Sequence, residues 1–182
     1  MNDRKTQDSI LVLQCQLGDS LAWDQLVAKW HPRMWRFVWG MLGERLSAED
    51  VLQNIWLRVV RSLILLRDPD KLSGWMYGIA RAAVADRLRE QYRAPVTDEF
   101  SDIFDEDDGP QAIDMSDSLR VGLAQLHPGD REVVVLFYLE EKTLDEVAEI
   151  CRIPSGTVKS RLHRARRVIH ETLKDEQHEH DL

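Results

Sequence analysis

The residues best suited to chemistry lie in one basic segment near the C-terminal end of the chain, from position 155 to 170. At about 100° per residue, an α-helix would gather the polar and cationic groups of this segment on one face. That face holds Ser160, His163, Arg164 and Arg167, with Lys159, Arg161 and Arg166 at its sides. Such side chains bind phosphate oxygens and base edges in the major groove of DNA. The segment therefore predicts a DNA-reading helix.

A tight turn between two helices would position these side chains. Thr143 and Glu146 have the spacing of a capping box, in which a hydroxyl and a carboxylate satisfy free amides at a helix start. A break over 152–154 follows, and Ser155 can cap the second helix. Opposite the basic face runs an apolar stripe formed by Val158, Leu162, Ala165 and Ile169. The pattern predicts a helix-turn-helix.

A solvated surface helix is the alternative interpretation of a basic face. An ordinary exposed helix mixes charges of both signs and gains ion pairs four residues apart. From Arg152 to Lys174, however, Glu171 is the only acidic residue, although the whole chain has a formal net charge of −8. Because positive charge is local in an acidic protein, the pattern favours a specific DNA-binding face over general attraction to polyanions.

Negative charge is concentrated between Pro95 and Leu119, where nine residues are acidic and none is Lys or Arg. A segment of this composition cannot bury enough apolar surface to fold alone. We therefore expect one domain over residues 9–94, an acidic flexible linker over 95–116 and a second domain over 117–175.

The sequence also bears on location and on the cysteines. It contains no apolar run long enough to span a bilayer and no signal-peptide pattern, so we expect a cytoplasmic protein without membrane insertion. Cys15 and Cys151 are far apart and lack the spacing of metal ligands. We expect buried or incidental thiols and no disulfide.

Apolar residues recur at helical spacing in the N-terminal part, which predicts helices over 20–42, 47–63 and 73–92. Pro32 is expected to kink the first helix, and Ser47 is expected to cap the second with Asp50. The face of the second helix opposite its core carries Asp50, Gln53, Asn54, Leu57 and Arg61. An outward leucine among polar residues is typical of a protein interface.

The third of these helices is expected to bind nucleic acid with its outward face. That face combines arginines with small and aromatic residues: Gly78, Arg81, Ala82, Ala85, Arg89, Tyr92 and Arg93, with Trp75 and Tyr77 near its upper end. Such a mixture supplies charge for phosphates and rings for base stacking. Trp75 keeps two interpretations, DNA binding and core packing, since most tryptophans at helical spacing are core.

Three ordered strings carry a family resemblance: SAEDVLQNIWLRVVRSL at 47–63, LSGWMYGIARAAVADRLRE at 72–90, and the helix-turn-helix at 143–170. Together they resemble the extracytoplasmic-function (ECF) branch of the sigma-70 family, which initiates bacterial transcription. The resemblance implies an all-α fold of two small helical domains, sigma-2-like and sigma-4-like. The first would bind core RNA polymerase and open the −10 promoter element, and the second would read the −35 element. It also implies an anti-sigma factor as a partner.

The resemblance assigns site residues by matching motif. It implies polymerase binding by Asp50, Gln53, Asn54 and Leu57, and contact with the −10 DNA by Arg67, Trp75, Tyr77, Arg81 and Arg89. It implies contact with the −35 DNA by Thr157, Lys159, Ser160, His163, Arg164 and Arg167. The family often has Arg where Gly78 stands and Asn where Ala82 stands, so its −10 sequence preference does not transfer.

Two other function classes are alternatives. A helix-turn-helix regulator that does not join core polymerase would carry a ligand or phosphoacceptor domain, but no alternation of strand and helix precedes the linker. An enzyme could bind a metal through the carboxylates at 105–108 or through His178 and His180. The sequence has neither a Gly-rich phosphate loop nor a nucleophile and histidine pair. We therefore expect no catalytic role, no cofactor and no metal site.

Overall fold

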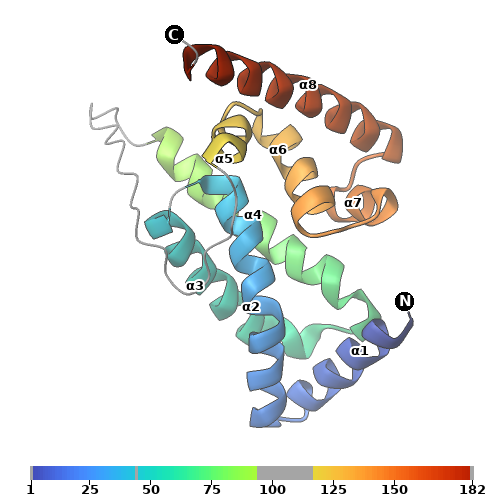
Figure 1. The fold of residues 1–182 in the computed structure, drawn as a ribbon. Helices are drawn as coiled ribbons and strands as arrows, with labels where there is room; N and C mark the ends of the chain where they lie inside the picture. The colour runs from blue at the N-terminus through green and yellow to red at the C-terminus, as the bar shows by residue number, and fades with distance from the viewer. Residues whose placement is uncertain (1, 44, 94–116, 181–182) are drawn as a thin grey trace.

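The computed structural model describes residues 2–43, 45–93 and 117–180, and within these ranges the chain is helical, without a β-strand (Figure 1). The main helices are α1 (Asn2–Gln16), α2 (Ser20–Leu42), α3 (Arg45–Ser62), α4 (Leu72–Arg93), α5 (Asp117–Ala124), α6 (Pro128–Val134), α7 (Leu144–Cys151) and α8 (Ser155–His180). Two 3-10 turns, η1 (Leu63–Leu65) and η2 (Pro69–Lys71), connect α3 to α4, and a π-helical turn, η3 (Val135–Leu139), continues α6. The expected all-α fold is confirmed.

Helices α1–α4 form an N-terminal bundle around an aromatic and aliphatic core. Its largest fully buried side chains include Trp30, Met34, Phe37, Ile55 and Tyr77. The central helix α2 begins after Asp19, whose carboxylate accepts hydrogen bonds from two amides of the first turn, and it ends at Gly43 with a φ of 74°. Both ends follow ordinary capping rules, since a left-handed C-cap favours glycine. The helix runs through Pro32 without interruption.

The predicted start of α3 is wrong. The helix begins at Arg45 and not after Ser47, so Ser47 lies inside the helix and cannot cap it. Ser47 is buried, and its hydroxyl accepts a 2.9 Å hydrogen bond from Nη2 of Arg87 on α4. A capping box is a local pattern. Here a partner 40 positions away uses the hydroxyl, which sequence spacing could not reveal.

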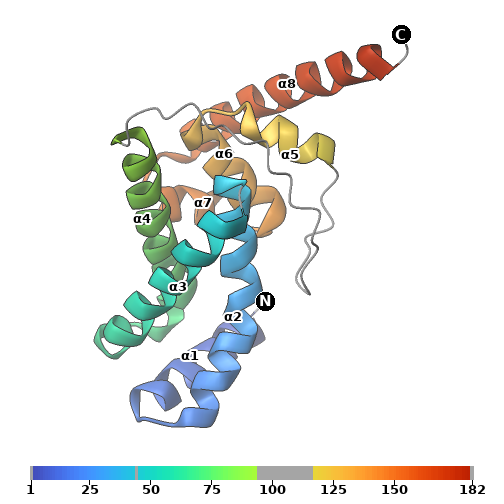
Figure 2. The same ribbon diagram turned by 90° about the vertical axis from the view of Figure 1, so that its left-hand side faces the viewer.

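Helices α5–α8 form a C-terminal bundle, and its buried apolar side chains belong to the same core cluster as those of the N-terminal bundle. Val133, Leu136, Val147, Leu162 and Ala165 are all buried. The two bundles touch: α7 packs on α4, and η3 packs on α2 (Figures 1 and 2). Helix α4 therefore packs against α2 and α3 on one side and against α7 on another, and these contacts decide which of its side chains are exposed.

The remaining expectations concern the cysteines, the acidic segment, the C-terminal histidines and membrane insertion. Cys15 and Cys151 are free and buried, as predicted, and burial raises the pKa of the Cys151 thiol to about 12. The acidic segment 95–116 lies outside the described residues, and so do the side chains of His178 and His180. No helix in the described ranges is both long enough and apolar enough to cross a membrane.

Candidate polymerase and DNA interfaces

The helix-turn-helix is built as its sequence predicts. The Thr143 hydroxyl accepts a hydrogen bond from the Glu146 amide at 3.3 Å, and the Glu146 carboxylate accepts one from the Thr143 amide at 2.9 Å. The capping box at the start of α7 is therefore confirmed. Arg152 ends α7 in the left-handed conformation with a φ of 55°, and α8 begins three residues later at Ser155. This turn directs the N-terminal half of α8 outward.

The outward face of α8 carries most of the side chains expected to contact the −35 DNA. Lys159, Ser160, His163 and Arg167 are exposed, while Thr157 is half-buried. The opposite stripe is packed, with Val158, Leu162 and Ala165 buried as predicted. The structure thus brings one cluster of basic and hydroxyl groups to the surface of a rigid helix.

Arg164 belongs to the same face but has a partner that the sequence did not reveal. Its Nε and Nη2 atoms each donate a 2.6 Å hydrogen bond to the carboxylate of Asp130 on α6. The Asp130 side chain is only 4% exposed, whereas that of Arg164 is 55% exposed. The hydrogen bonds from Arg164 lower the pKa of Asp130 against the opposing effect of burial. A third hydrogen bond, from Arg161 to the Gly129 carbonyl at 3.2 Å, also connects α8 to the start of α6.

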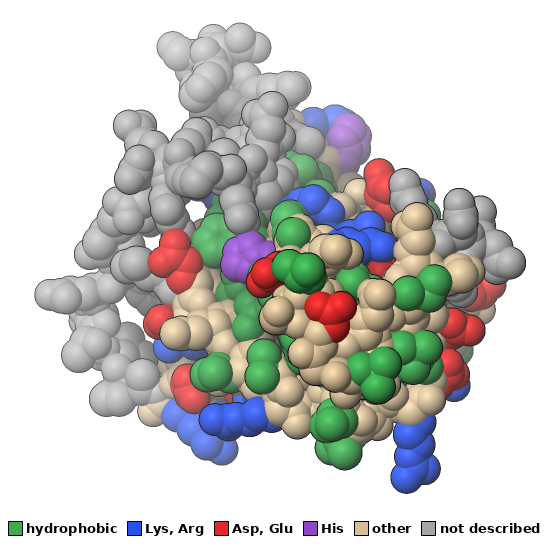
Figure 3. Space-filling model, turned by 90° about the horizontal axis from the view of Figure 1, so that it is seen from below, with side chains coloured by type: hydrophobic (Ala, Val, Ile, Leu, Met, Phe, Trp, Pro, Cys, Tyr) green, Lys and Arg blue, Asp and Glu red, His purple; other side chains and the backbone are tan. Residues whose placement is uncertain are grey.

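The four residues expected to bind polymerase share the exposed face of α3. Asp50, Gln53, Asn54 and Leu57 are all exposed, and the exposed stripe continues through Val60 and, in the adjoining turn η1, Ile64. We call these six residues the α3 stripe. Figure 3 shows the lower end of the molecule, where hydrophobic side chains form separate patches among polar groups and not one continuous area. Leucine and valine beside polar groups suit a mixed protein interface.

The residues expected along the −10 DNA do not form one exposed face. Arg67 and Arg89 are exposed, and Arg89 is paired with Asp86, which also binds Arg58. Trp75 is half-buried and packs against the core, so part of its ring is accessible.

The expectation that Tyr77 faces outward to meet DNA is wrong. The ring is fully buried, with its centroid 6.0 Å from that of Trp30 and 5.6 Å from that of Phe37. Its hydroxyl donates a 2.6 Å hydrogen bond to Glu140, which follows η3 in the C-terminal bundle. Helix periodicity placed Tyr77 near the outward face of α4. The ring instead lies in the core of the N-terminal bundle, and its hydroxyl reaches Glu140 of the C-terminal bundle.

Glu140 is a buried carboxylate held by the other bundle. Its side chain is 1% exposed, and it accepts hydrogen bonds from Tyr77 and, at 3.1 Å, from Nε of Arg36. Burial raises the pKa of Glu140, although the bonds from Tyr77 and Arg36 oppose this effect. Burial, and then the charge of Glu140, raises the pKa of Tyr77. The phenol therefore stays protonated and acts as a donor.

Arg81 is also directed at the C-terminal bundle. Its guanidinium pairs with Glu132 on α6, with one of the two hydrogen bonds at 3.2 Å, and donates to the carbonyl oxygens of Ile150 and Cys151 at the end of α7. Its side chain is 26% exposed. Burial alone would lower the pKa of Arg81, but the hydrogen bond and charge of Glu132 outweigh it and raise the pKa. Arg81 is thus fully charged, and its guanidinium already has hydrogen-bond partners in the C-terminal bundle.

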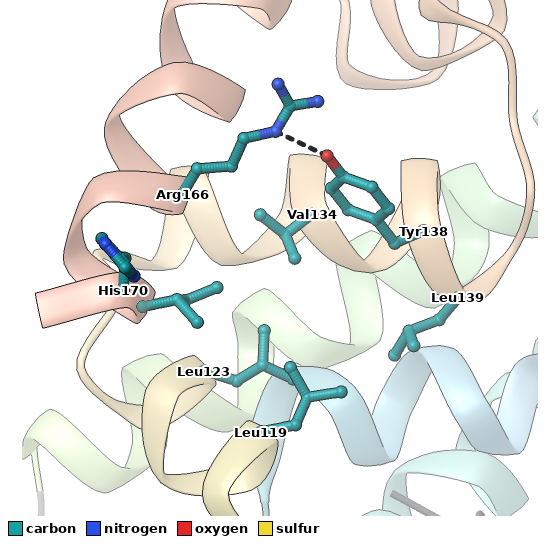
Figure 4. A pocket seen from close by; sticks show the side chains of 8 residues that line it. Leu119, Leu123, Val134, Tyr138, Leu139, Arg166 and His170 are labelled. Atoms are coloured by element: carbon teal, nitrogen blue, oxygen red, sulfur yellow. Dashed lines mark hydrogen bonds between the residues drawn. The ribbon is translucent and has the colours of Figure 1, made fainter. Parts of the chain in front are cut away.

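An apolar pocket in the C-terminal bundle was not anticipated from the sequence. It has a volume of about 380 Å³ and lies between α5, the α6–η3 segment and α8 (Figure 4). At its rim, Nε of Arg166 donates a 2.6 Å hydrogen bond to the hydroxyl of Tyr138. The spacing of Leu119 and Leu123, four residues apart on α5, indicates an apolar helix face. It does not predict the pocket, because the other lining residues come from α6, η3 and α8. Among the described residues, no group of three or more His, Cys, Asp or Glu side chains could hold a metal ion.

Comparisons with known proteins match this arrangement over most of the chain. The family models for sigma-70 region 2 and sigma-70 region 4 match residues 26–94 and 116–169. The chain is 32% identical to the RNA polymerase sigma factor CarQ of Myxococcus xanthus, covering 86% of this chain and 91% of CarQ. It is 30% identical to the ECF RNA polymerase sigma-E factor of Haemophilus influenzae, covering 91% and 95%. The fold is similar to that of the sigma factor RpoE of Bartonella quintana, solved in complex with the anti-sigma factor NepR. The TM-score is 0.68, with 23% identity over 84% of this chain and 96% of that one.

Proposed function

The chain belongs to the ECF branch of the sigma-70 family of RNA polymerase sigma factors, and we propose that its two bundles divide the work of promoter recognition. Sigma factors bind core RNA polymerase and direct it to promoter DNA. In this division, residues 9–94 bind core polymerase and the −10 element, residues 117–175 read the −35 element, and residues 95–116 link them. A helix-turn-helix regulator that does not join polymerase is not favoured, because the relatives match along nearly their whole length and are themselves sigma factors.

One observation carries the proposal: a single chain presents an exposed mixed stripe on α3 and an exposed basic face on α8. The α3 stripe has the composition of a protein interface, with Leu57 as an apolar anchor between Asp50, Gln53 and Asn54. The α8 face has the groups that contact phosphates and base edges. A regulator that acts alone needs the second surface and not the first.

Within the C-terminal bundle, the contacting and positioning roles fall to different residues. We assign the −35 DNA contacts to the exposed residues Lys159, Ser160, His163 and Arg167, with Thr157 at the helix start. Arg164 is half-exposed and paired with Asp130, so its main task is to hold α8 at a fixed angle against α6. Asp130 thereby acts as a positioning residue for −35 recognition.

Within the N-terminal bundle, we assign −10 contacts to Arg67, Trp75, Arg81 and Arg89, and assign Tyr77 to packing. The first four are exposed or partly exposed side chains around α4. Tyr77 instead supports α4 from inside, through Trp30 and Phe37.

An anti-sigma protein is the expected regulatory partner, by analogy with the NepR complex of the Bartonella quintana factor. We assign no catalytic role, since sigma factors act as recognition subunits of polymerase. The protein is expected to work in the cytoplasm, where polymerase and promoters are found.

Reconstitution tests the proposed function. The purified chain is added to core RNA polymerase with a library of random promoter fragments, and run-off transcripts are sequenced. We expect promoter-specific transcripts only when both proteins are present. Asp50→Arg should weaken capture of core polymerase several-fold by reversing a charge in the interface. The matched control is Asp24→Arg, which makes the same change at an exposed position of α2. A chain that binds DNA specifically but never captures core polymerase would support the regulator alternative.

A further inference from the structure

The start of α6 receives a second arginine of α8, beside the pair that Asp130 and Arg164 form. Nη1 of Arg161 donates a 3.2 Å hydrogen bond to the carbonyl oxygen of Gly129. We propose that Gly129 is a positioning residue for −35 recognition: its missing side chain leaves the space in which the Arg161 guanidinium rests on α6, and this contact helps to hold α8 in its reading orientation. The inference rests on the proposed role of α8 in reading the −35 element.

Any side chain at position 129 would occupy part of the space that the guanidinium fills. A Cβ atom built on Gly129 would lie 2.9 Å from Nη1 of Arg161, 3.3 Å from its Cζ and 3.6 Å from its Nη2. Three atoms of one guanidinium group thus face the same side of Gly129. Because 2.9 Å is well inside van der Waals contact for a carbon atom, the Arg161 guanidinium would have to leave this position.

Glycine is needed at position 129 for space and not for its backbone conformation. Among the glycines of the described ranges, Gly18 and Gly43 have a positive φ, and Gly129 does not. Gly129 lies in the first turn of α6, where the backbone suits any residue except for space, and alanine favours a helix more than glycine does. Alanine at this position should therefore leave α6 intact and displace only the end of a flexible side chain.

The two attachments of α8 to α6 lie next to each other. Gly129 and Asp130 are consecutive, and Arg161 and Arg164 are three residues apart, so they are neighbours on the surface of α8. The Gly129 peptide is itself held, since its amide donates a 3.2 Å hydrogen bond to Nδ1 of His127. One attachment alone permits α8 to rotate about that point, whereas two restrict the rotation. The Gly129 contact therefore adds to the orientation that the Asp130 pair provides.

The same contact withholds a positive charge from DNA. Arg161 is half-buried against α6, although it directly follows the exposed Ser160. A displaced Arg161 guanidinium would enter solvent beside the outward face of α8, where it can bind phosphate whatever the base sequence. Loss of orientation lowers the affinity for the correct −35 sequence, while the freed cation raises the affinity for every sequence. The proposal thus predicts a loss of discrimination and not a uniform loss of affinity.

The test measures discrimination by the holoenzyme. The quantity is the ratio of its affinities for a promoter selected in the transcription assay and for the same fragment with a scrambled −35 element. We expect Gly129→Ala to lower this ratio about threefold, the size of one half-exposed hydrogen bond. Its thermal stability and its capture of core polymerase should match wild type. The control is Gly74→Ala on α4, which should keep the wild-type ratio because a Cβ atom there meets no atom within 4 Å.

A double substitution shows whether the effect passes through Arg161. In the Arg161→Ala background, Gly129→Ala should cause no further loss, since there is no guanidinium left to displace. Three results would overturn the inference: an unchanged ratio in Gly129→Ala, the same loss in both backgrounds, or a lower melting temperature, which would show that alanine disturbs α6 itself. Failure of the proposed function would look different, because wild type would then not discriminate and Lys159→Ala would leave the ratio unchanged.

Discussion

The two DNA-facing helices place the same kind of side chain in opposite situations. On α8, Lys159 projects from an exposed face, and Arg167 is exposed on the same face with a 3.9 Å ion pair to the equally exposed Glu171. On α4, Arg81 is held by a carboxylate and two carbonyl oxygens of the other bundle. Both helices are basic by sequence. The comparison teaches that the availability of a basic residue depends on its tertiary partners, which decide whether its charge is free or already paired.

A second contrast lies between the ion pairs themselves. Asp130 and Arg164 pair within one bundle, with the carboxylate buried and the guanidinium half-exposed. Glu140 pairs between bundles, with Arg36 and Tyr77. The first pair joins α8 to α6 and does not depend on contact between the bundles. The second exists only while the bundles are in contact, which is the closed state, so substitutions at the two sites should have separable effects.

The largest expected effect is the loss of stability on truncating Tyr77, because its ring is fully buried. The size of this loss distinguishes a packed ring from one that stacks on DNA. Tyr77→Ala should lower the free energy of unfolding by about 3–5 kcal/mol, as for other buried aromatic truncations. Tyr77→Phe keeps the packing and loses only the bond to Glu140. Tyr92→Ala is the control, since that ring is 82% exposed on the same helix. Chemical denaturation followed by circular dichroism measures all three. Equal stability of Tyr77→Ala and Tyr92→Ala would show that Tyr77 is not part of the core.

Asp130→Ala should weaken −35 binding by the holoenzyme, on the order of threefold to tenfold, because a partly screened ionic hydrogen bond that orients α8 is lost. Removing a negative charge near DNA would by itself strengthen binding, so the sign is informative. Asp145→Ala removes an exposed carboxylate from α7 and should not weaken binding. Band-shift titration on a promoter selected in the transcription assay measures the effect.

A double substitution then separates positioning from base reading. If Arg164 acts through Asp130, the variant Asp130→Ala with Arg164→Ala should bind no worse than either single variant. If Arg164 instead reads a base edge, Arg164→Ala alone should relax the preference at one base pair, and Asp130→Ala should not.

Local patterns in the sequence were sufficient for α2, α4 and the helix-turn-helix, and for α3 apart from its start, whereas α1, α5 and α6 were not predicted. The Thr143 and Glu146 capping box and the stripe of Val158, Leu162 and Ala165 depend on contacts within four residues, which spacing alone reveals. The exposed α3 stripe follows from the same periodicity. Such features need no contact between the bundles.

Tertiary partners account for what sequence reasoning missed. Tyr77 meets Glu140 across 63 positions, and Arg81 meets Glu132 across 51. The periodicity of α4 assigns most of its residues to the correct face, but it misplaces Tyr77 and does not indicate that a second bundle covers Arg81. Ser47 was assigned to a cap for the same reason, because its partner Arg87 is distant in sequence.

The smallest expected effect is on pH dependence, where the two carboxylates should act with opposite signs. The folded-state pKa of Glu140 is raised above its ordinary 4.5, so its contribution to the closed state is full below 4.5 and is lost as pH rises through the raised value. The pKa of Asp130 is lowered below 3.8, so its contribution is full above 3.8 and is lost as pH falls through the lowered value. Mild acidification toward 4.5 should therefore favour closure while leaving the Asp130 pair intact.

Glu140→Gln isolates the first effect from other titrating groups. The pKa of Glu140 depends on Tyr77, Arg33 and Arg36, and the charge of Glu140 affects the pKa of Lys142. All four neighbours remain in the variant. Scattering at several pH values should show wild type becoming a few-fold more closed as pH falls toward 4.5, and Glu140→Gln changing less. If the two respond identically, Glu140 does not contribute to closure through its charge. The contrast between an ion pair within a bundle and one between bundles would then rest on Arg81 and Glu132 alone.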